Sequence, residues 1–258
     1  ERASARETAV RTALAGVARR FLEEFGVRIG SRVISIGGES DPTDASVLPV
    51  SEINPRADAS PVRCLQTKAS RRMVAAIEAA RKEGDTLGGV FEVLVSGLPA
   101  GLGSYAQWDR RLEGDLAKAF MSLNAVKGGE IGLGFEASRR RGSAAHDALF
   151  WSEDKTRVLR RTNRSGGIDG GVTTGETLVV RAGMKPLATL MRPLASVDLK
   201  TRLEAPAAIE RSDVCAVPAA AVIGEALAAL EVADAFLRKY GGDSMEEIQA
   251  RHALSRSV

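Results

Sequence analysis

A charged triplet near the end of the chain offers the clearest potential for chemistry. Arg211, Ser212 and Asp213 lead directly into a long stretch of small and apolar residues that contains Pro218. Asp213 has two interpretations: it caps the following helix, or it belongs to a functional site. As an N-cap it would place Pro218 at the fifth helical position, where the proline ring meets the carbonyl four residues back. We therefore favour a helix that begins at Pro218, with the triplet on an irregular lead-in whose charges need partners.

The stretch after Pro218 predicts a helix that is mostly buried. It leaves little polar surface before the stop signal Gly241-Gly242. Its apolar positions are Val222, Ile223, Ala226, Leu230, Val232 and Phe236. The triplet is thus expected beside the core.

The rest of the chain predicts helices and strands in groups. We expect three further helices, over 4–25, 69–83 and 110–124. The first carries an apolar residue every three or four positions: Val10, Leu14, Val17, Phe21 and Phe25. Strands are expected over 27–38, 90–96 and 176–182, a surface excursion over 41–61, and a strand pair or irregular chain over 190–203. Grouped rather than strictly alternating elements favour an α+β fold.

Composition describes a globular protein of 258 residues with a formal net charge of +3. Its two cysteines, Cys64 and Cys215, lie far apart, which predicts free thiols in a cytosolic protein. His146 and His252 have no zinc-type spacing, and no apolar run reaches transmembrane length. Few aromatic residues and no basic tail argue against a nucleic-acid partner.

One long motif is specific enough to indicate a family. The run R-S-D-V-C-A-V-P-A-A-A-V-I-G-E-A-L over 211–227 resembles the C-terminal signature of chorismate synthases. Further matches follow in order, so the resemblance covers nearly the whole chain. They are A-S-A-R-E-T at 3–8, N-A-V-K-G-G-E-I-G at 124–132, G-G-I-D-G-G at 166–171 and Lys185-Pro186. Gly129 departs from the family's common valine, and Leu187 and Ala188 depart from expected polar residues.

The resemblance implies a fold, a reaction and partners. The expected fold is an α+β sheet–helix–sheet sandwich, with 1–258 as one chorismate synthase domain. Because the chain starts at Glu1 without Met, we expect an upstream part with a Gly-x-Ser-His-Gly segment, and poor catalysis without it. The implied enzyme is a cytoplasmic, homotetrameric lyase of the shikimate pathway. It would convert 5-enolpyruvylshikimate 3-phosphate to chorismate and phosphate with reduced FMN, and NADPH is a candidate reductant.

The resemblance also implies roles for individual residues. Asp213 is the implied catalytic residue, a proton relay beside flavin N5. The implied FMN-binding residues are Arg2, Ala3, Ser4, Asn124, Ala125, Gly170, Lys185, Pro186, Leu187, Ala188, Thr189 and Arg211. No metal site is implied.

Several of these residues also have structural interpretations. Ser4 and Glu7 have the form of a capping box, and Asn124 suits a helix C-cap. Lys185 alone would be a surface residue, and Arg139–Arg141 suit either a solvated loop or an active-site lid. The run G-L-P-A-G-L-G at 97–103 lacks the Lys and Ser/Thr of a phosphate loop, so we assign it to backbone geometry. The alternative function is a flavin- or phosphate-binding fragment without catalysis.

Overall fold

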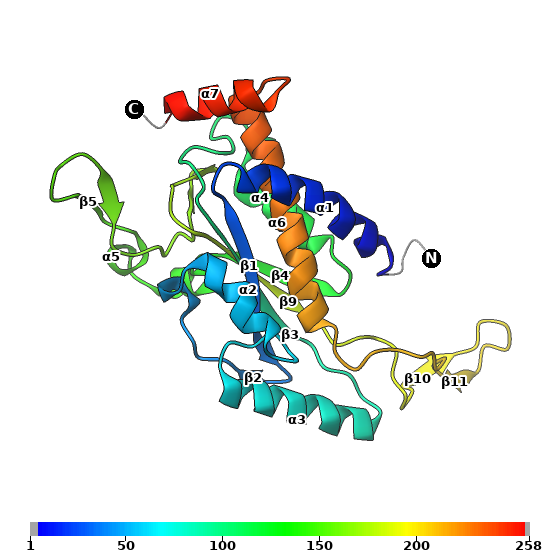
Figure 1. Ribbon diagram of the computed structural model, residues 1–258. Coiled ribbons are helices and arrows are strands. Elements are labelled where there is room, and N and C mark those ends of the chain that lie inside the picture. The colour runs from blue at the N-terminus through cyan, green and yellow to red at the C-terminus, as the bar shows by residue number, and fades with distance from the viewer. Residues whose placement is uncertain (1–4, 256–258) are drawn as a thin grey trace.

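A five-stranded antiparallel sheet forms the centre of the protein (Figure 1). The computed structural model describes residues 5–255. The strand order is β2-β1-β3-β9-β4. These strands are β1 (Arg28–Ile36), β2 (Glu39–Ser40), β3 (Gly89–Ser96), β4 (Val126–Ile131) and β9 (Leu178–Met184). The predicted strands over 27–38, 90–96 and 176–182 are therefore confirmed to within two residues at either end.

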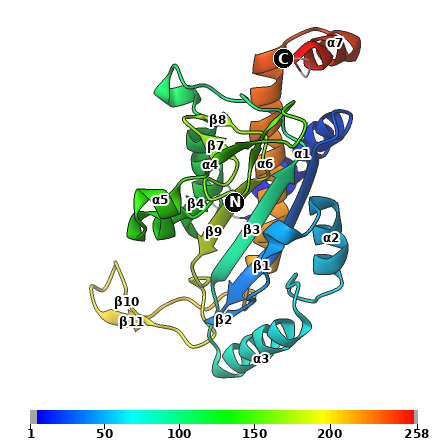
Figure 2. The same ribbon diagram turned by 90° about the vertical axis from the view of Figure 1, so that its left-hand side faces the viewer.

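Each face of the sheet buries apolar side chains because neighbouring residues along a strand point to opposite sides. On β3, Phe91, Val93 and Val95 belong to the main core, whereas Leu94 packs in a smaller core with Ile53. The main core lies under the helices α1 (Glu7–Glu23), α4 (Leu112–Met121) and α6 (Val217–Tyr240). Figure 2 shows α6 running behind β1, β3 and β9.

Helix α6 confirms the prediction of a buried helix that begins at Pro218. It starts one residue earlier, at Val217, and ends before Gly241. A Cβ on Gly224 would lie 2.7 Å from the ring of Phe91, so only glycine allows this close approach to β3. Helix α6 therefore packs directly against the sheet.

The segment 41–61 contains a helix that the sequence does not predict. Helix α2 (Val50–Asp58) packs Val50 and Ile53 in the smaller core, on the sheet face opposite α6. The expectation of a surface excursion was wrong here because Pro55 and the polar composition mask a short apolar stripe. Proline at the sixth helical position removes one backbone donor but does not prevent the helix.

The face that α2 covers carries a row of alternating charges across four strands. Arg32, Glu92, Arg181 and Glu130 lie directly opposite one another on β1, β3, β9 and β4. Ion pairs of 2.8 Å, 3.0 Å and 3.7 Å join them in that order. We call this row the charge ladder.

The residues of α1 that face the core differ from those that its apolar spacing indicates. Val10, Leu14 and Val17, whose spacing predicts this helix, are 64%, 61% and 74% exposed and do not face the core. Leu22 and Ala15 are buried instead, and Phe21 packs partly against the core. The helix begins at Glu7, and Ser4 of the expected capping box lies outside the described residues.

The remaining elements lie at the ends of the sheet and on projecting arms. Two are helices, α3 (Thr67–Glu83), predicted from the sequence, and α7 (Met245–Ser255), which was not. Three are hairpins: β5 (Leu149–Trp151) with β6 (Val158–Arg160), β7 (Ile168–Asp169) with β8 (Val172–Thr173), and β10 (Ala195–Val197) with β11 (Glu204–Pro206). Short helical turns are η1 (Ala45–Val47), η2 (Trp108–Arg110), η3 (Gly134–Arg139) and α5 (Gly142–Ala145).

These elements confirm the α+β class. Cys64 and Cys215 are both free thiols, as the sequence predicts. Over residues 5–255, none of the helices has the length and apolar character needed to span a membrane.

Candidate functional site

Two of the matched segments meet where β9 ends and β4 begins. Met184 pairs with Val126 across the sheet, and the next residue, Lys185, donates its backbone N–H to the carbonyl of Ala125 at 2.9 Å. Asn124 and Ala125 therefore lie beside the segment 185–189. The resemblance assigns both to the same ligand, and the sheet brings them together.

The third segment reaches the same end of the sheet through the turn between α3 and β3. Leu87 in this turn donates its N–H to the carbonyl of Val214 at 2.8 Å, next to Asp213. Thr86 donates its hydroxyl to the carbonyl of Leu187 at 2.7 Å. Residues 124–125, 185–189 and 211–214 thus gather at one end, which we call the signature cluster.

The charged side chains of the signature cluster face solvent. Lys185, Arg211 and Asp213 are all exposed. The expectation that the triplet lies beside the core with charges that need partners was therefore wrong, because water solvates these side chains. Among residues 5–255, the Lys185 ammonium donates one hydrogen bond, to the carbonyl of Pro186 at 3.4 Å. None of the three side chains forms an ion pair with another residue between 5 and 255. Two cations therefore remain available for an anionic ligand.

Ala125 has a backbone conformation that alanine rarely adopts. Its φ is +65°, in the left-handed region, where a Cβ is disfavoured. Helix α4 ends at Met121 with Ser122 as its C-cap, so Asn124 is not the cap that the alternative interpretation proposed. Unfavourable backbone angles that are not needed to end a helix occur often at ligand sites.

The thiol of Cys215 lies just after Asp213 and is poorly suited to chemistry. Burial raises its pKa, and the backbone N–H of Val217 offsets this only in part. The thiol therefore stays protonated at neutral pH, and the thiolate is the reactive form. Asp213 is the better candidate for proton transfer in this segment.

Gly170 lies apart from the signature cluster. Leu112, the first residue of α4, donates its N–H to the carbonyl of Gly171, whereas the far end of α4 leads to Asn124. Ten helical residues span about 15 Å at a rise of 1.5 Å each. The chain therefore does not bring Gly170 next to Lys185, and its flavin role stays a prediction. Arg2, Ala3 and Ser4 lie outside the described residues.

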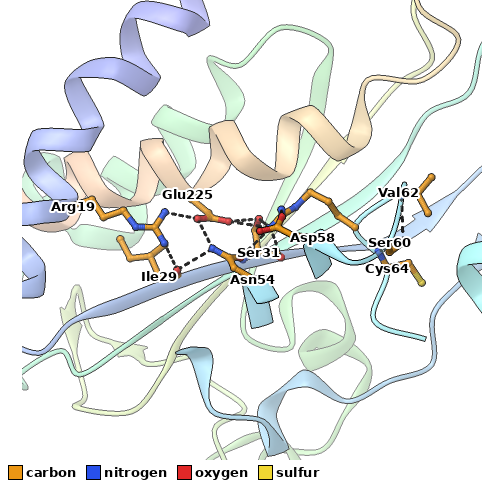
Figure 3. Close-up of polar contacts among 10 residues, drawn as sticks. Arg19, Ile29, Ser31, Asn54, Asp58, Ser60, Val62, Cys64 and Glu225 are labelled. Carbon is orange, nitrogen blue, oxygen red and sulfur yellow. Dashed lines mark hydrogen bonds and ion pairs between the residues drawn. The ribbon is translucent and has the colours of Figure 1, made fainter. Parts of the chain in front are cut away.

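A buried carboxylate fixes the helix that follows Asp213. Glu225 of α6 is 3% exposed and accepts hydrogen bonds from Arg19 at 2.6 Å, Ser31 at 2.6 Å and Asn54 at 3.0 Å (Figure 3). Arg63 approaches the same carboxylate at 3.3 Å. These partners come from α1, β1, α2 and the segment before α3, so one side chain joins four parts of the fold to α6.

Sequence interpretation missed both Glu225 and Thr86. The signal for Glu225 was its position as a lone acid within a run of small apolar residues, because a buried charge requires partners. Thr86 stands in G-D-T-L-G-G, which the sequence marks only as a helix break. No pattern in the sequence shows that its hydroxyl reaches Leu187, more than one hundred positions away.

A second polar groove lies on the sheet face opposite α6. Glu92, Arg160, Asn163 and Arg181 line it, together with Arg161. One of its carboxylates, Glu92, binds the guanidinium of Arg181 at 3.0 Å, and Arg161 stacks 4.0 Å from the ring centre of Phe150. Arg160 Nε and Asn163 Oδ1 in this groove are buried without a hydrogen-bond partner among the described residues. The signature cluster is the stronger candidate site because three segments that match the resemblance meet there.

The architecture is that of an α+β protein with a cationic cluster at one end of its main sheet. The family model described as chorismate synthase matches residues 1–237. The chain therefore belongs to the chorismate synthase family.

Individual relatives agree with this assignment. The chain is 54% identical over 247 residues to the chorismate synthase of Symbiobacterium thermophilum, covering 96% of this chain and 63% of the relative. It is 49% identical over 260 residues to that of Geobacter sulfurreducens, covering 98% and 65%. A crystal structure of a chorismate synthase superimposes with a TM-score of 0.84 at 42% identity, covering 98% of this chain and 70% of the other. The chain thus spans slightly less than two thirds of these two relatives' length, and the fold is of the chorismate synthase type.

Proposed function

We propose that the protein acts as a chorismate synthase, a lyase that eliminates phosphate from 5-enolpyruvylshikimate 3-phosphate to give chorismate. The observation that carries the proposal is the signature cluster. Three segments that are distant in sequence, at 124–125, 185–189 and 211–214, meet at one end of the sheet. Each of them matches a family motif, so their meeting supports a shared ligand.

The residues of the cluster suit an anionic, phosphate-bearing cofactor. Lys185 and Arg211 present exposed cations that have no ion-pair partner among residues 5–255. Both side chains form strong charge-assisted hydrogen bonds with phosphate oxygens. We infer that these two residues hold FMN, with the backbone of Ala125 and of residues 186–189 against its neutral parts. When bound, reduced FMN supplies electron density to the departing allylic system.

The chain's own residues would position the substrate and move a proton. The reaction removes a C–H proton and an allylic phosphate from opposite faces of the ring, with no net change of redox state. We assign Asp213 to the proton transfer because its carboxylate is exposed and free of ion pairs with other described residues. The buried, paired carboxylate of Glu225 cannot take this role without breaking its contacts.

The measurement that tests the proposal is phosphate release from 5-enolpyruvylshikimate 3-phosphate under anaerobic reducing conditions. We expect release with pre-reduced FMN, and none without FMN or with oxidised FMN. FMN binding without any phosphate release would support the alternative, a flavin-binding protein without catalysis. Native mass spectrometry checks the further expectation of a homotetramer, and fractionation checks a cytoplasmic location.

A further inference from the structure

We propose that Thr86 is a positioning residue that holds the cofactor-binding segment and the Asp213 segment in a fixed relation. The inference rests on the proposed function, since it assigns the turn at 84–89 to the same site. The turn is the link between segments 185–189 and 211–214. Within the described chain, no hydrogen bond joins these two segments directly.

The turn contacts both segments through hydrogen bonds. The Thr86 side chain is buried and gives its hydroxyl to the carbonyl of Leu187 at 2.7 Å. One residue later, the N–H of Leu87 binds the carbonyl of Val214 at 2.8 Å. At the start of the turn, the carbonyl of Gly84 accepts from the N–H of Arg192 at 3.1 Å. Thr86 therefore binds the segment 185–189, and the next residue, Leu87, binds the segment 211–214.

Close packing at the end of the turn reinforces these contacts. A Cβ on Gly88 would lie 2.3 Å from the carbonyl oxygen of Met184 and 2.8 Å from the nitrogen of Pro186. Only glycine fits at this distance, because real Cβ atoms do not approach backbone atoms so closely. The backbone of the turn lies directly against the residues that flank Lys185.

The turn is itself anchored on both sides, so it can serve as a fixed support. Gly84 ends α3 with φ +72°, and Asp85 donates its N–H to the carbonyl of Ala80 at 2.9 Å. The carboxylate of Asp85 accepts from the N–H of Thr86 at 2.7 Å. At the end of the turn, the carbonyl of Gly88 accepts from the N–H of Gly37, and β3 begins at Gly89. Movement of residues 185–189 relative to Asp213 therefore requires either the Thr86–Leu187 or the Leu87–Val214 hydrogen bond to break.

The test compares three substitutions in the protein. Thr86→Val keeps the shape but removes the hydroxyl, which leaves the carbonyl of Leu187 without this donor. Thr86→Ser restores a hydroxyl. Thr12→Val is the matched control, since Thr12 also donates its hydroxyl to a carbonyl, that of Thr8, at 2.9 Å within α1.

Two quantities are measured for each variant: the Kd for FMN by fluorescence titration, and the exchange rate of the Leu87 amide hydrogen in flavin-free protein. We expect Thr86→Val to raise the Kd about tenfold, or ~1.4 kcal/mol, and to speed Leu87 exchange by a similar factor. Thr86→Ser should restore both to within about twofold, and Thr12→Val should change neither. If Thr86→Val does not fold, Thr86→Ala takes its place, because it removes the hydroxyl without adding atoms.

The outcomes separate the inference from the proposed function. If the wild-type protein binds no FMN, the proposed function fails, and Leu87 exchange alone then decides whether Thr86 links the segments. An unchanged Kd and unchanged exchange in a folded Thr86→Val protein overturn the inference. An equal loss in Thr12→Val also overturns it, because the effect would then be one of general stability.

Discussion

Replacing Glu225 by alanine tests how far one carboxylate holds α6 in place. The change removes the acceptor of Arg19, Ser31 and Asn54 at once and leaves two guanidinium groups beside an apolar cavity. Removing one partner of a buried ion pair costs about 3–5 kcal/mol, because the other charge remains buried.

The structure places the expected loss near the lower end of this range. The side chain of Arg19 is 35% exposed and keeps a hydrogen bond to the carbonyl of Ile29 at 2.6 Å. Arg63 is 11% exposed and keeps its ion pair with Asp58 and a hydrogen bond to the carbonyl of Ser31 at 3.0 Å. Since both arginines retain other acceptors, we expect Glu225→Ala to lower the free energy of unfolding by about 3 kcal/mol. Glu225→Gln, which keeps the size, should lower it by about 2 kcal/mol.

Urea denaturation followed by far-ultraviolet circular dichroism measures both values. The matched control is Glu52→Gln, because Glu52 pairs with Arg56 at 2.5 Å on the surface, with 47% of its side chain exposed. We expect that variant to lose no more than about 0.5 kcal/mol. If Glu225→Ala loses less than about 1 kcal/mol, or no more than the control, the carboxylate does not anchor α6.

Three further predictions concern the proposed site and the effect of pH. Asp213→Asn should lower single-turnover phosphate release about 10²–10⁴-fold with unchanged FMN affinity and thermal midpoint; near wild-type turnover removes Asp213 from proton transfer. Gly170→Val should abolish FMN binding in folded protein, because a β-branched residue is strained at φ +61° and its side chain would fill the space through which the flavin approaches; unchanged FMN affinity contradicts the flavin-contacting role of Gly170. Burial, helped by the nearby Asp115 carboxylate, raises the pKa of Glu231. Its stabilising contribution is present below its unfolded pKa and is lost as pH rises through the folded value. Glu231→Gln should therefore raise the thermal midpoint at pH 7 but not below about pH 4, and equal midpoints at pH 7 would refute this.

Periodicity and terminal signals predicted the long elements well. The helix after Pro218 and the helix that ends before Gly84 have apolar patterns with clear start or stop residues, and the structure confirms both. Helix α2 escaped prediction because Val50, Ile53 and Ala57 are too few to outweigh Pro55. The apolar spacing over 10–25 correctly predicted helix α1, but such a pattern does not say which neighbour will cover the apolar residues.

The candidate site was predictable in its residues but not in its assembly. The resemblance supplied Lys185, Arg211 and Asp213, which are exposed and carry no periodic signal of their own. Their meeting depends on backbone hydrogen bonds such as that from Leu87 to Val214, and these do not depend on side-chain type. Contacts of this kind become visible only once the strands are paired.

The charge ladder has a consequence for how the strands find their alignment during folding. Strand β3 ends at Ser96 and its neighbour β9 begins at Leu178, so the two strands can pair only after the long segment between them has been synthesised. Loop closure over such a span is slow. A shift by one residue would move Arg181 to the other side of the sheet and leave Glu92 facing an apolar neighbour. The ladder therefore penalises misaligned pairing between β3 and β9 and favours one hydrogen-bonding register.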